Sequence, residues 1–494
     1  MSTEEDPYLS KSNLISVWQC PKMLYFEINE PELADYDPQV ESLFATGHAV
    51  GDIAKELYKS DINIEVGYDN GLEDAIEETK EIIEDNNDEV IYDAVFEFEG
   101  ILVRADILQP YKEGYKLIEV KATTSKEFHH ELECAIQYWV MSRCGVELTG
   151  VFLAHINNQF VYEKEGCYEG FLQEVDLTER AKELRPSVGK MVFDSKYSAE
   201  TKLDVSVGSH CSSPYDCRFT KQCWPSDTKY PLTGLGGDKK KLAEWANAGI
   251  KDIRDVSSDD ITSETHHRIH ATTLLEKPEV NAQAKNELNS LPYPRYYLDF
   301  ESINPAIPIW LGFRPYQAVP IQYSCHIQHN SDYDSLDHVE FLELEDMPPL
   351  EKLADQLISD LGDKGPVFMY SDYEKKMIQA LIDIFPDKKA SLDAIIDRLV
   401  DLFPIVKNSY YHPDMLGSWS IKKVMPTINT EFDYAKLDGI KEGFAASEGF
   451  IEAIKSETDS DRKKELESQL KRYCKFDTEA MVELVKFFES YKTE

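Results

Sequence analysis

Charged side chains gather in one stretch of the chain, from Arg104 to Ala122, which reads RADILQPYKEGYKLIEVKA. We expect two short strands here, joined by a turn at Pro110 to Gly114. Glu119 and Lys121 are two residues apart on the second strand and therefore share one face of the sheet. Antiparallel pairing would bring Asp106 beside them. Two carboxylates and an ammonium group on one face predict a site for a divalent ion and for the phosphate that the ion activates.

A second set of acidic residues lies in the C-terminal part of the chain, on a predicted strand, a helix start and a final helix: Asp299, Glu301, Glu374 and Asp477. Such a set suits a two-metal phosphodiesterase, in which carboxylates hold two ions about 4 Å apart. Tyr473 precedes Asp477 by four residues, so both lie on one helix face, where Tyr473 can orient the attacking water. Asp372 is the alternative to Glu374 as the third acid.

Four cysteines are predicted to form a metal centre. Cys211, Cys217 and Cys223 are separated by five residues each time, in a segment rich in Ser, Pro and Asp. Three thiols in such a loop are a signal for metal ligands, and Cys20 supplies a fourth. The spacing is compatible with a four-iron four-sulfur cluster or with Zn²⁺. The remaining thiols are predicted to be buried small hydrophobes, at Cys134, Cys144, Cys167, Cys325 and Cys474.

The net charge of −40 limits the choice of partners. Contact with nucleic-acid phosphates requires local Lys and Arg, whereas the summed field of this chain repels a polyanion. Either basic residues line clefts within an acidic shell, or the partner is not nucleic acid. The densest basic run is Lys239 to Lys241.

The length of 494 residues predicts two or three domains. No run of about 18 apolar residues occurs, so we expect no membrane span. The N-terminus lacks the features of a signal peptide, and we therefore predict a cytoplasmic protein.

The elements that must position these residues follow from hydrophobic periodicity. We expect helices at residues 11–26, 41–58 and 128–144, and strands at 90–99, 101–108, 117–120, 151–156 and 160–162. Residues 231–290 read as a helical linker that resembles a helix-hairpin-helix element. A second domain opens with strands at 296–300 and 319–327, followed by a strand at 366–370 that leads into the helix carrying Glu374. The whole is an α/β protein.

The first domain resembles the RecB-family nucleases of the PD-(D/E)xK superfamily, whose core motif is matched by Asp106, Glu119 and Lys121. The resemblance implies that Gln137, on the following helix, belongs to the site and that the Val120 carbonyl is a further metal ligand. The subgroup with an iron–sulfur cluster, which includes CRISPR-associated and AddAB-type nucleases, also places one Cys early and three late. The family's helix histidine falls near Gly51 here, and His48 lies one turn earlier.

The second domain resembles the DnaQ-like 3′–5′ exonucleases of the ribonuclease H fold, tyrosine subtype. The resemblance rests on LDFE, YSDYE and the closing Tyr473-x-x-x-Asp477. The text YYHPDMLGSWSIKKVMP also resembles an uncharacterised family that carries such a domain at its C-terminus.

Together these features predict a fusion of two nucleases, with a RecB-like domain at residues 1–230, the linker at 231–290 and a DnaQ-like domain at 291–494. Lys121, Gln137 and Tyr473 are the expected catalytic residues, and Mg²⁺ or Mn²⁺ the expected ions. The expected substrate is DNA, with single strands or ends favoured and Trp18 available for base stacking. The alternatives are a nucleic-acid-binding or assembly protein with one or both sites inactive, and an RNA-processing exonuclease. A helicase, repair or defence partner is compatible with the resemblance, but the sequence identifies none.

Overall fold

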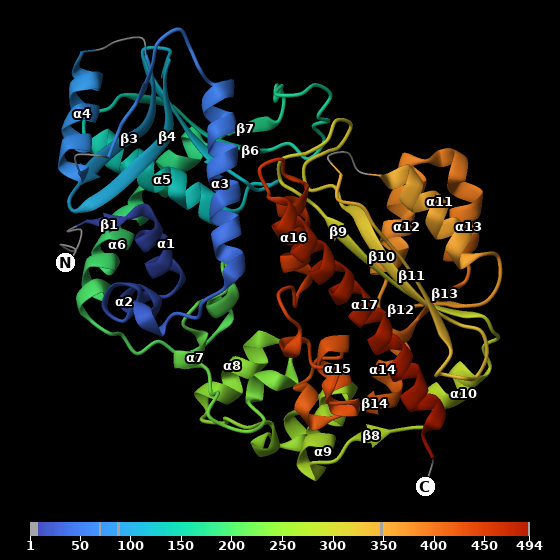
Figure 1. The fold of residues 1–494 in the computed structure, drawn as a ribbon. Coiled ribbons are helices and arrows are strands. Elements are labelled where there is room, and N and C mark those ends of the chain that lie inside the picture. Colours follow the sequence, from blue (N-terminus) through green and yellow to red (C-terminus); the bar gives the residue numbers. More distant parts are fainter. Residues whose placement is uncertain (1–7, 69–70, 86–88, 346–348, 493–494) are drawn as a thin grey trace. The chain divides into compact units, whose positions relative to one another are not determined.

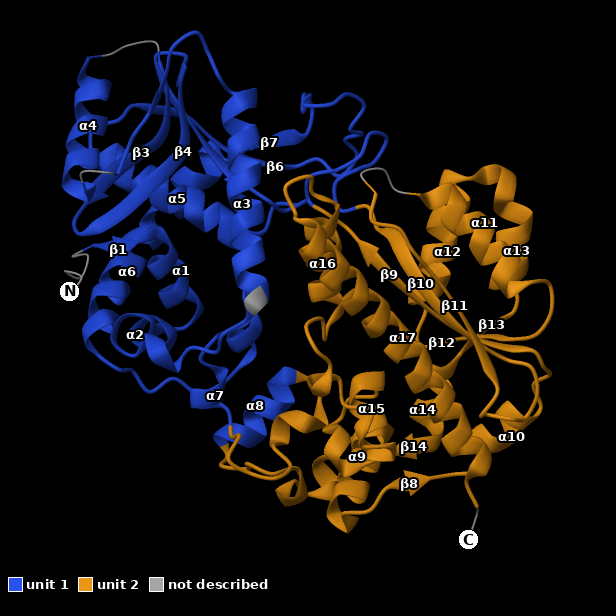
Figure 2. Ribbon diagram, viewed as in Figure 1, with its two compact units in different colours: residues 1–224, 239–247, 306–316 blue, residues 225–238, 248–305, 317–494 orange. Residues whose placement is uncertain are grey.

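The chain folds into two compact units in a computed structural model that describes residues 8–68, 71–85, 89–345 and 349–492. Unit 1 comprises residues 1–224, 239–247 and 306–316, and unit 2 comprises residues 225–238, 248–305 and 317–494 (Figure 2). The stretch 231–290, expected as a linker, is therefore divided between the two units. The fold class is mixed α/β, as predicted.

Unit 1 is built on a seven-stranded mixed sheet in the order β2-β3-β4-β5-β6-β7, with β1 also paired to β4 (Figure 1). Its strands are β1 Leu9–Ser10, β2 Asn63–Glu65, β3 Val90–Phe98, β4 Ile101–Tyr111, β5 Gly114–Lys121, β6 Leu148–Ile156 and β7 Leu172–Asp176. The strands β3, β4 and β5 form an antiparallel meander, whereas β5 and β6 are parallel. The connection between these two parallel strands is α5, as a crossover requires.

The helices of unit 1 are α1 Lys11–Gln19, α2 Pro21–Asn29, α3 Pro38–Leu57, α4 Leu72–Glu84, α5 Phe128–Arg143, α6 Thr178–Glu200, α7 Thr220–Cys223 and α8 Lys239–Asn247. Helix α5 packs against β3, β4 and β6, and α6 packs against α5. The apolar core lies between these helices and the sheet and includes Leu117, Ile136, Val140 and Leu153.

The helix expected over residues 11–26 is two helices, α1 and α2, because the chain is extended at Cys20 (φ −160°, ψ 115°). Pro21 follows directly, and the residue before a proline is disfavoured in the helical conformation. Pro21 then opens α2, where its missing N–H costs nothing. The break leaves Cys20 between the two helices.

Unit 2 contains a five-stranded sheet in the order β11-β10-β9-β12-β13 and a small sheet of β8 and β14. Its strands are β8 Glu279–Val280, β9 Arg295–Ile303, β10 Val319–Gln328, β11 Leu336–Leu342, β12 Val367–Met369, β13 Leu399–Asp401 and β14 Tyr410–Tyr411. Strands β9, β10 and β11 are antiparallel, and β12 runs parallel to β9 and β13.

The helices of unit 2 are α9 Glu264–Leu275, α10 Gln283–Asn289, α11 Leu350–Leu361, α12 Tyr373–Ile384, α13 Lys389–Ile396, α14 Leu402–Ser409, α15 Ile421–Ile428, α16 Gly443–Ile454 and α17 Ser460–Ser490. The long helix α17 packs against β9 and β10 (Figure 1). This contact places the helix that bears Asp477 against the strand that bears Asp299 and Glu301.

Two further expectations about unit 1 were wrong, and one helix was not predicted. Residues 160–162 form no strand, although Phe160 and Tyr162 are buried in an aromatic cluster, so the apolar residues reflect burial and not extension. The 23-residue helix α6 was missed because Pro186 lies inside it. Cys144 and Cys167 are exposed, whereas Cys134, Cys325 and Cys474 are buried as expected.

None of the described helices combines the length and the apolar character that a membrane span requires.

Candidate functional site

The first candidate site lies where β4 and β5 run side by side in unit 1. Ile107 pairs with Ile118 across the antiparallel ladder, so Asp106 and Glu119 occupy the neighbouring positions on the two strands. The carboxylate of Asp106 accepts a hydrogen bond from the Val120 backbone N–H at 2.7 Å. The structure thus brings together the two acids that the sequence analysis paired.

Three side chains donate to the Glu119 carboxylate, which is almost completely buried. The ammonium groups of Lys11 and Lys121 both contact its Oε1 atom, with Lys121 at 2.9 Å. The Gln137 side-chain amide donates to Oε2 at 2.5 Å. Glu133, one turn before Gln137 on α5, accepts from Lys121 at 2.5 Å. Lys121 and Gln137 were expected in this site, but Lys11 and Glu133 were not.

The electrostatics of these groups differ within the site. Burial and the neighbouring charge of Glu119 raise the pKa of Asp106 to about 7. Burial acts in the same direction on Glu119, but the charges of Lys11 and Lys121 outweigh it and lower the pKa of this carboxyl below its usual range. Burial opposes the charge on Lys121, yet Glu119 and Glu133 raise its pKa well above the ordinary value. Glu119 and Lys121 are therefore both charged at neutral pH.

A cavity of about 190 Å³ opens beside Asp106. Its lining includes His48, Asp52, Asp93 and Arg104. His48, which the sequence left as a candidate ligand, is exposed on α3 and lines the same cavity as Asp106. Asp93 has φ 58°, an uncommon conformation for a residue with a side chain, and its carboxylate pairs with Lys55 at 2.6 Å and Arg104 at 3.0 Å.

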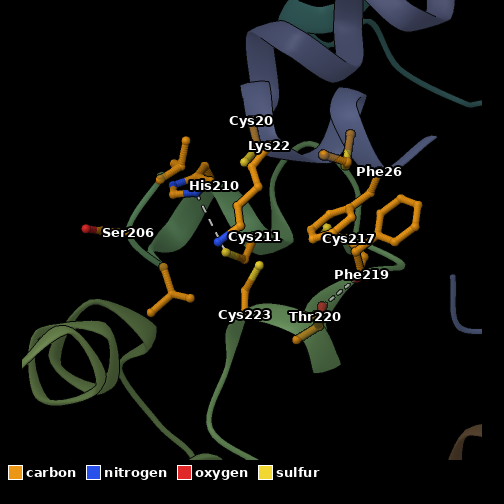
Figure 3. Close-up of a pocket in the computed structure, with 13 residues that line it drawn as sticks. Cys20, Lys22, Phe26, Ser206, His210, Cys211, Cys217, Phe219, Thr220 and Cys223 are labelled. Atoms are coloured by element: carbon orange, nitrogen blue, oxygen red, sulfur yellow. Dashed lines mark hydrogen bonds between the residues drawn. The ribbon is translucent and has the colours of Figure 1, made fainter. Parts of the chain in front are cut away.

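The four predicted metal-binding cysteines line a single pocket in unit 1, as Figure 3 shows. Cys20 comes from the break between α1 and α2, and Cys211, Cys217 and Cys223 come from the later loop and α7. Figure 3 also shows His210 beside Cys211, with its Nε2 atom 3.7 Å from the sulfur. Phe26 and Phe219 stack at 5.2 Å on the apolar side of this pocket.

The spacing of the sulfur atoms bears on the kind of group that fits. In the part of the chain that the structure describes, only Asp299, Glu301 and Cys474 bring three potential ligand atoms within 4.8 Å of one another. A tetrahedral zinc ion with bonds of about 2.3 Å holds its sulfurs about 3.8 Å apart, whereas a cluster of several iron and sulfide ions is wider. Burial raises the pKa of the Cys20 and Cys223 thiols and that of Cys217 to about 11, so a positively charged group is needed to hold them as thiolates.

The second candidate site lies in unit 2, between β9, α12 and α17. Asp299 and Glu301 alternate along β9 and so face the same side, with Glu301 8% exposed. Asp477 comes from α17 and is also 8% exposed. Cys474, one turn before Asp477, donates its S–H to Asp299 Oδ2 at 3.4 Å.

Glu374, and not Asp372, belongs to this buried group. Glu374 lies in the first turn of α12 and is 2% exposed, and its Oε2 atom has no hydrogen-bond partner. Asp372 is exposed and pairs with Lys376 at 3.0 Å. The turn into α12 passes through Ser371 at φ 97°, a strained conformation that the Ser371 N–H bond to Asp401 at 3.0 Å stabilises.

The four carboxylates of unit 2 disfavour one another's charge. Burial and the charges of Asp477 and Glu301 raise the pKa of Asp299 well above its usual range. Burial and Asp477 raise the pKa of Glu301 in the same way. Burial raises the pKa of Glu374 to about 8 and that of Asp477 to about 6. A buried orphan oxygen and four mutually repelling carboxylates fit hard divalent ions such as Mg²⁺ or Mn²⁺.

Two further residues complete the second site and were missed from the sequence. Lys422, on α15, donates to the Tyr473 hydroxyl at 3.0 Å, and its charge lowers the pKa of both Glu301 and Asp477 against the effect of burial. The Tyr434 hydroxyl donates to Asp477 Oδ1. Both residues lie in the segment before α17. Lys422 belongs to the text SIKKVMP, and Tyr434 follows that text.

Comparisons with known proteins give similarity without a function. Residues 296–420 match the model of a domain of unknown function, DUF2779. The chain is 26% identical over 322 residues to the uncharacterized protein MG366 of Mycoplasma genitalium, covering 61% of this chain and 45% of that protein. The chain thus spans less than half the length of this relative. The crystal structure of SSO0001 aligns with 45% of this chain and 88% of that one, at 16% identity and a TM-score of 0.24.

Proposed function

We propose that the protein is a metal-dependent nuclease that hydrolyses phosphodiester bonds of DNA at two separate sites. The observation that carries the proposal is that Asp299, Glu301, Glu374 and Asp477 form one buried group. The pKa values of these carboxyls are raised, so bound cations would stabilise their charged forms. Four carboxylates drawn from a strand and two helices, with Lys422 acting on two of them, are typical of a two-metal phosphodiesterase. This arrangement is the one expected for a DnaQ-like exonuclease of the ribonuclease H fold.

In the second site, Asp299, Glu301, Glu374 and Asp477 would hold the ions. When bound, divalent ions neutralise the attacked phosphate and make water a stronger nucleophile. The Tyr473 hydroxyl, fixed by Lys422 at 3.0 Å, would orient the attacking water. Tyr434 would hold the Asp477 carboxylate in place through its hydroxyl.

In the first site, Asp106 and Glu119 would hold Mg²⁺ or Mn²⁺ in a PD-(D/E)xK fold of the RecB type. Lys121 would position the nucleophile or stabilise the charge that develops on the phosphate. Gln137 would fix the Glu119 carboxylate, to which it donates at 2.5 Å. Support comes from the convergence of these four residues on one face of the β4–β5 hairpin and α5.

The four-thiol pocket would hold a four-iron four-sulfur cluster that ties α1 and α2 to the later loop. The four thiols line one pocket, as this cluster or the alternative, Zn²⁺, requires. Iron and acid-labile sulfide in protein purified without oxygen check this assignment, and zinc in their place contradicts it.

Exposed aromatic side chains support a single-stranded substrate for the first site. Trp18 and Phe128 are 40% and 45% exposed, and their rings lie 5.6 Å apart. The guanidinium of Arg180 lies 5.8 Å from the Phe128 ring. Unstacked bases pack on such aromatic and guanidinium surfaces. The charge of Arg180 itself is paired with Glu131 at 2.8 Å and with Glu183 at 3.1 Å.

The proposal is tested by digestion of DNA labelled at either end, single- or double-stranded, with Mg²⁺ or Mn²⁺. We expect Lys121→Ala to lower cleavage by the first site about 100-fold or more, and Asp299→Ala to lower cleavage by the second site to the same extent. Each single variant should therefore lose part of the total cleavage, and the double variant should lose all of it. Lys112→Ala and Asp438→Ala, exposed changes in the same units, should cleave normally. Metal-dependent DNA binding with cleavage unaffected by either site variant would disprove the nuclease assignment. Labelled RNA of the same sequence tests the alternative of an RNA-processing exonuclease.

A further inference from the structure

Lys11 is a charged residue of the first site for which the proposed chemistry supplies no role. It is 108 residues from Glu119 in sequence, yet its ammonium group donates to the same Oε1 atom that Lys121 contacts. The Lys11 nitrogen also lies 3.7 Å from Glu133 Oε2. Its side chain is only 18% exposed.

The backbone fixes this position independently of the ion pair. Lys11 is the first residue of α1, whose N-cap Ser10 forms a capping box with Asn13. Just before the cap, Leu9 pairs with Ile101 on β4, the strand that carries Asp106. The start of α1 is therefore attached to the same sheet as the catalytic acids, which keeps the backbone of Lys11 beside the site.

The charges around Glu119 then nearly cancel. Glu119 and Glu133 are balanced by Lys11 and Lys121, which leaves Asp106 as the one acid without a lysine partner in this group. One divalent ion satisfies Asp106 together with one side of Glu119. A second ion would face two ammonium groups on the Oε1 atom that it needs.

We propose that Lys11 is a positioning residue that acts as a built-in cation, holding Glu119 in place and restricting the first site to one divalent ion. This inference rests on the proposed function of the first site. It gives the two sites different metal requirements, one ion in unit 1 and two in unit 2.

Direct counting of bound Mn²⁺ tests the proposal. Free Mn²⁺ is followed by electron paramagnetic resonance during titration of the full chain carrying Asp299→Ala and Asp477→Ala, which remove two of the four proposed ligands of the second site. With Lys11 present we expect one bound ion. Lys11→Gln, which keeps a hydrogen-bond donor but no charge, should bind two ions or bind the first about tenfold more tightly. Lys11→Arg should restore the single ion, and Lys190→Gln, on an exposed face of α6, should change nothing.

Unchanged stoichiometry and affinity in Lys11→Gln would overturn the inference. If that variant does not fold, Glu133→Gln gives the second test. Without the Glu133 charge, Glu119 is the remaining carboxylate partner of Lys11 and Lys121. Mn²⁺ should then bind about tenfold more weakly. Equal affinity there also overturns it. The titration needs no nucleic acid, so a protein that binds one ion but cleaves nothing fails the proposed function while leaving the role of Lys11 intact.

Discussion

Both candidate sites contain buried acids, but the negative charge of these acids is balanced differently in the two sites. In unit 1, Lys11 and Lys121 bond directly to Glu119, whose pKa falls below its usual range despite burial. In unit 2, the charge of Lys422 opposes burial at Glu301 and Asp477 only, and the pKa values of all four carboxyls rise. The first site is held together by its own ion pairs, whereas under the proposed function the second would take its cations from solution.

The largest effect that follows from this comparison concerns Glu119. Glu119→Gln leaves Lys11 and Lys121 without their shared partner in a buried site, and breaking a buried ion pair in this way costs about 3–5 kcal/mol. We expect unit 1 to lose that much stability in EDTA, measured by urea unfolding with hydrogen exchange resolved for each unit. Glu113→Gln, at the exposed turn between β4 and β5, should stay within about 0.5 kcal/mol of the wild type.

The matched change in the second site, Asp299→Asn, should have the opposite sign in EDTA. The buried Asp299 carboxyl, whose pKa is raised, must either carry a repelled charge or take up a proton at neutral pH, and an amide does neither. A loss of stability in unit 2 comparable to that of Glu119→Gln in unit 1 would show that the two sites do not differ in charge balance.

The pH dependence of stability separates the units further. Glu374 and Asp477 keep their protons in the folded state up to about pH 8 and about pH 6, whereas their ordinary pKa values are 4.5 and 3.8. A raised pKa in the folded state means that stability is lost as pH rises from the unfolded to the folded value. Metal-free unit 2 should therefore lose on the order of 8 kcal/mol between pH 4 and pH 8.

Unit 1 should lose less over the same interval, since one acid of its site, Asp106, has a raised pKa, about 7. The Glu119 carboxyl has the opposite effect because its pKa is lowered in the folded state. Its contribution to the stability of unit 1 is present above the ordinary pKa and is lost only as pH falls through the lowered value. Saturating Mg²⁺ should flatten the profile of unit 2. An equal slope in the two units, or no response to Mg²⁺ in unit 2, contradicts this assignment.

The sequence predicted the acids of both sites more fully than the cations that complete them. Asp106, Glu119 and Lys121 follow from strand alternation, and Tyr473 and Asp477 from helix periodicity, because each pair depends on local geometry alone. Lys11 and Lys422 reach their sites only through long-range packing: α1 is attached to β4, and α15 packs against α17. A lysine on a short helix gives no local signal that it faces a carboxylate elsewhere in the fold.

The same limit applies to the elements. Hydrophobic periodicity located α3, α5 and the strands β3 to β6, since these segments have one buried face. It missed α6, whose Pro186 reads as a helix break, and it took the buried aromatic residues Phe160 and Tyr162 for a strand. The division of residues 231–290 between two units depends on tertiary contacts that composition does not reveal.

The smallest predicted effect tests whether the single lysine of the second site contributes to its chemistry. Lys422 fixes the Tyr473 hydroxyl at 3.0 Å and lies 5.2 Å from the ring centroids of both Tyr473 and Tyr434. In the Lys121→Ala background, Lys422→Met should lower the kcat of the second site about tenfold, equivalent to about 1.4 kcal/mol, with KM for DNA little changed, because the water is less well oriented while the metal ligands remain. The adjacent exposed change Lys423→Met is the matched control and should leave kcat unaltered. An increase in KM with kcat unchanged would instead assign Lys422 to substrate binding.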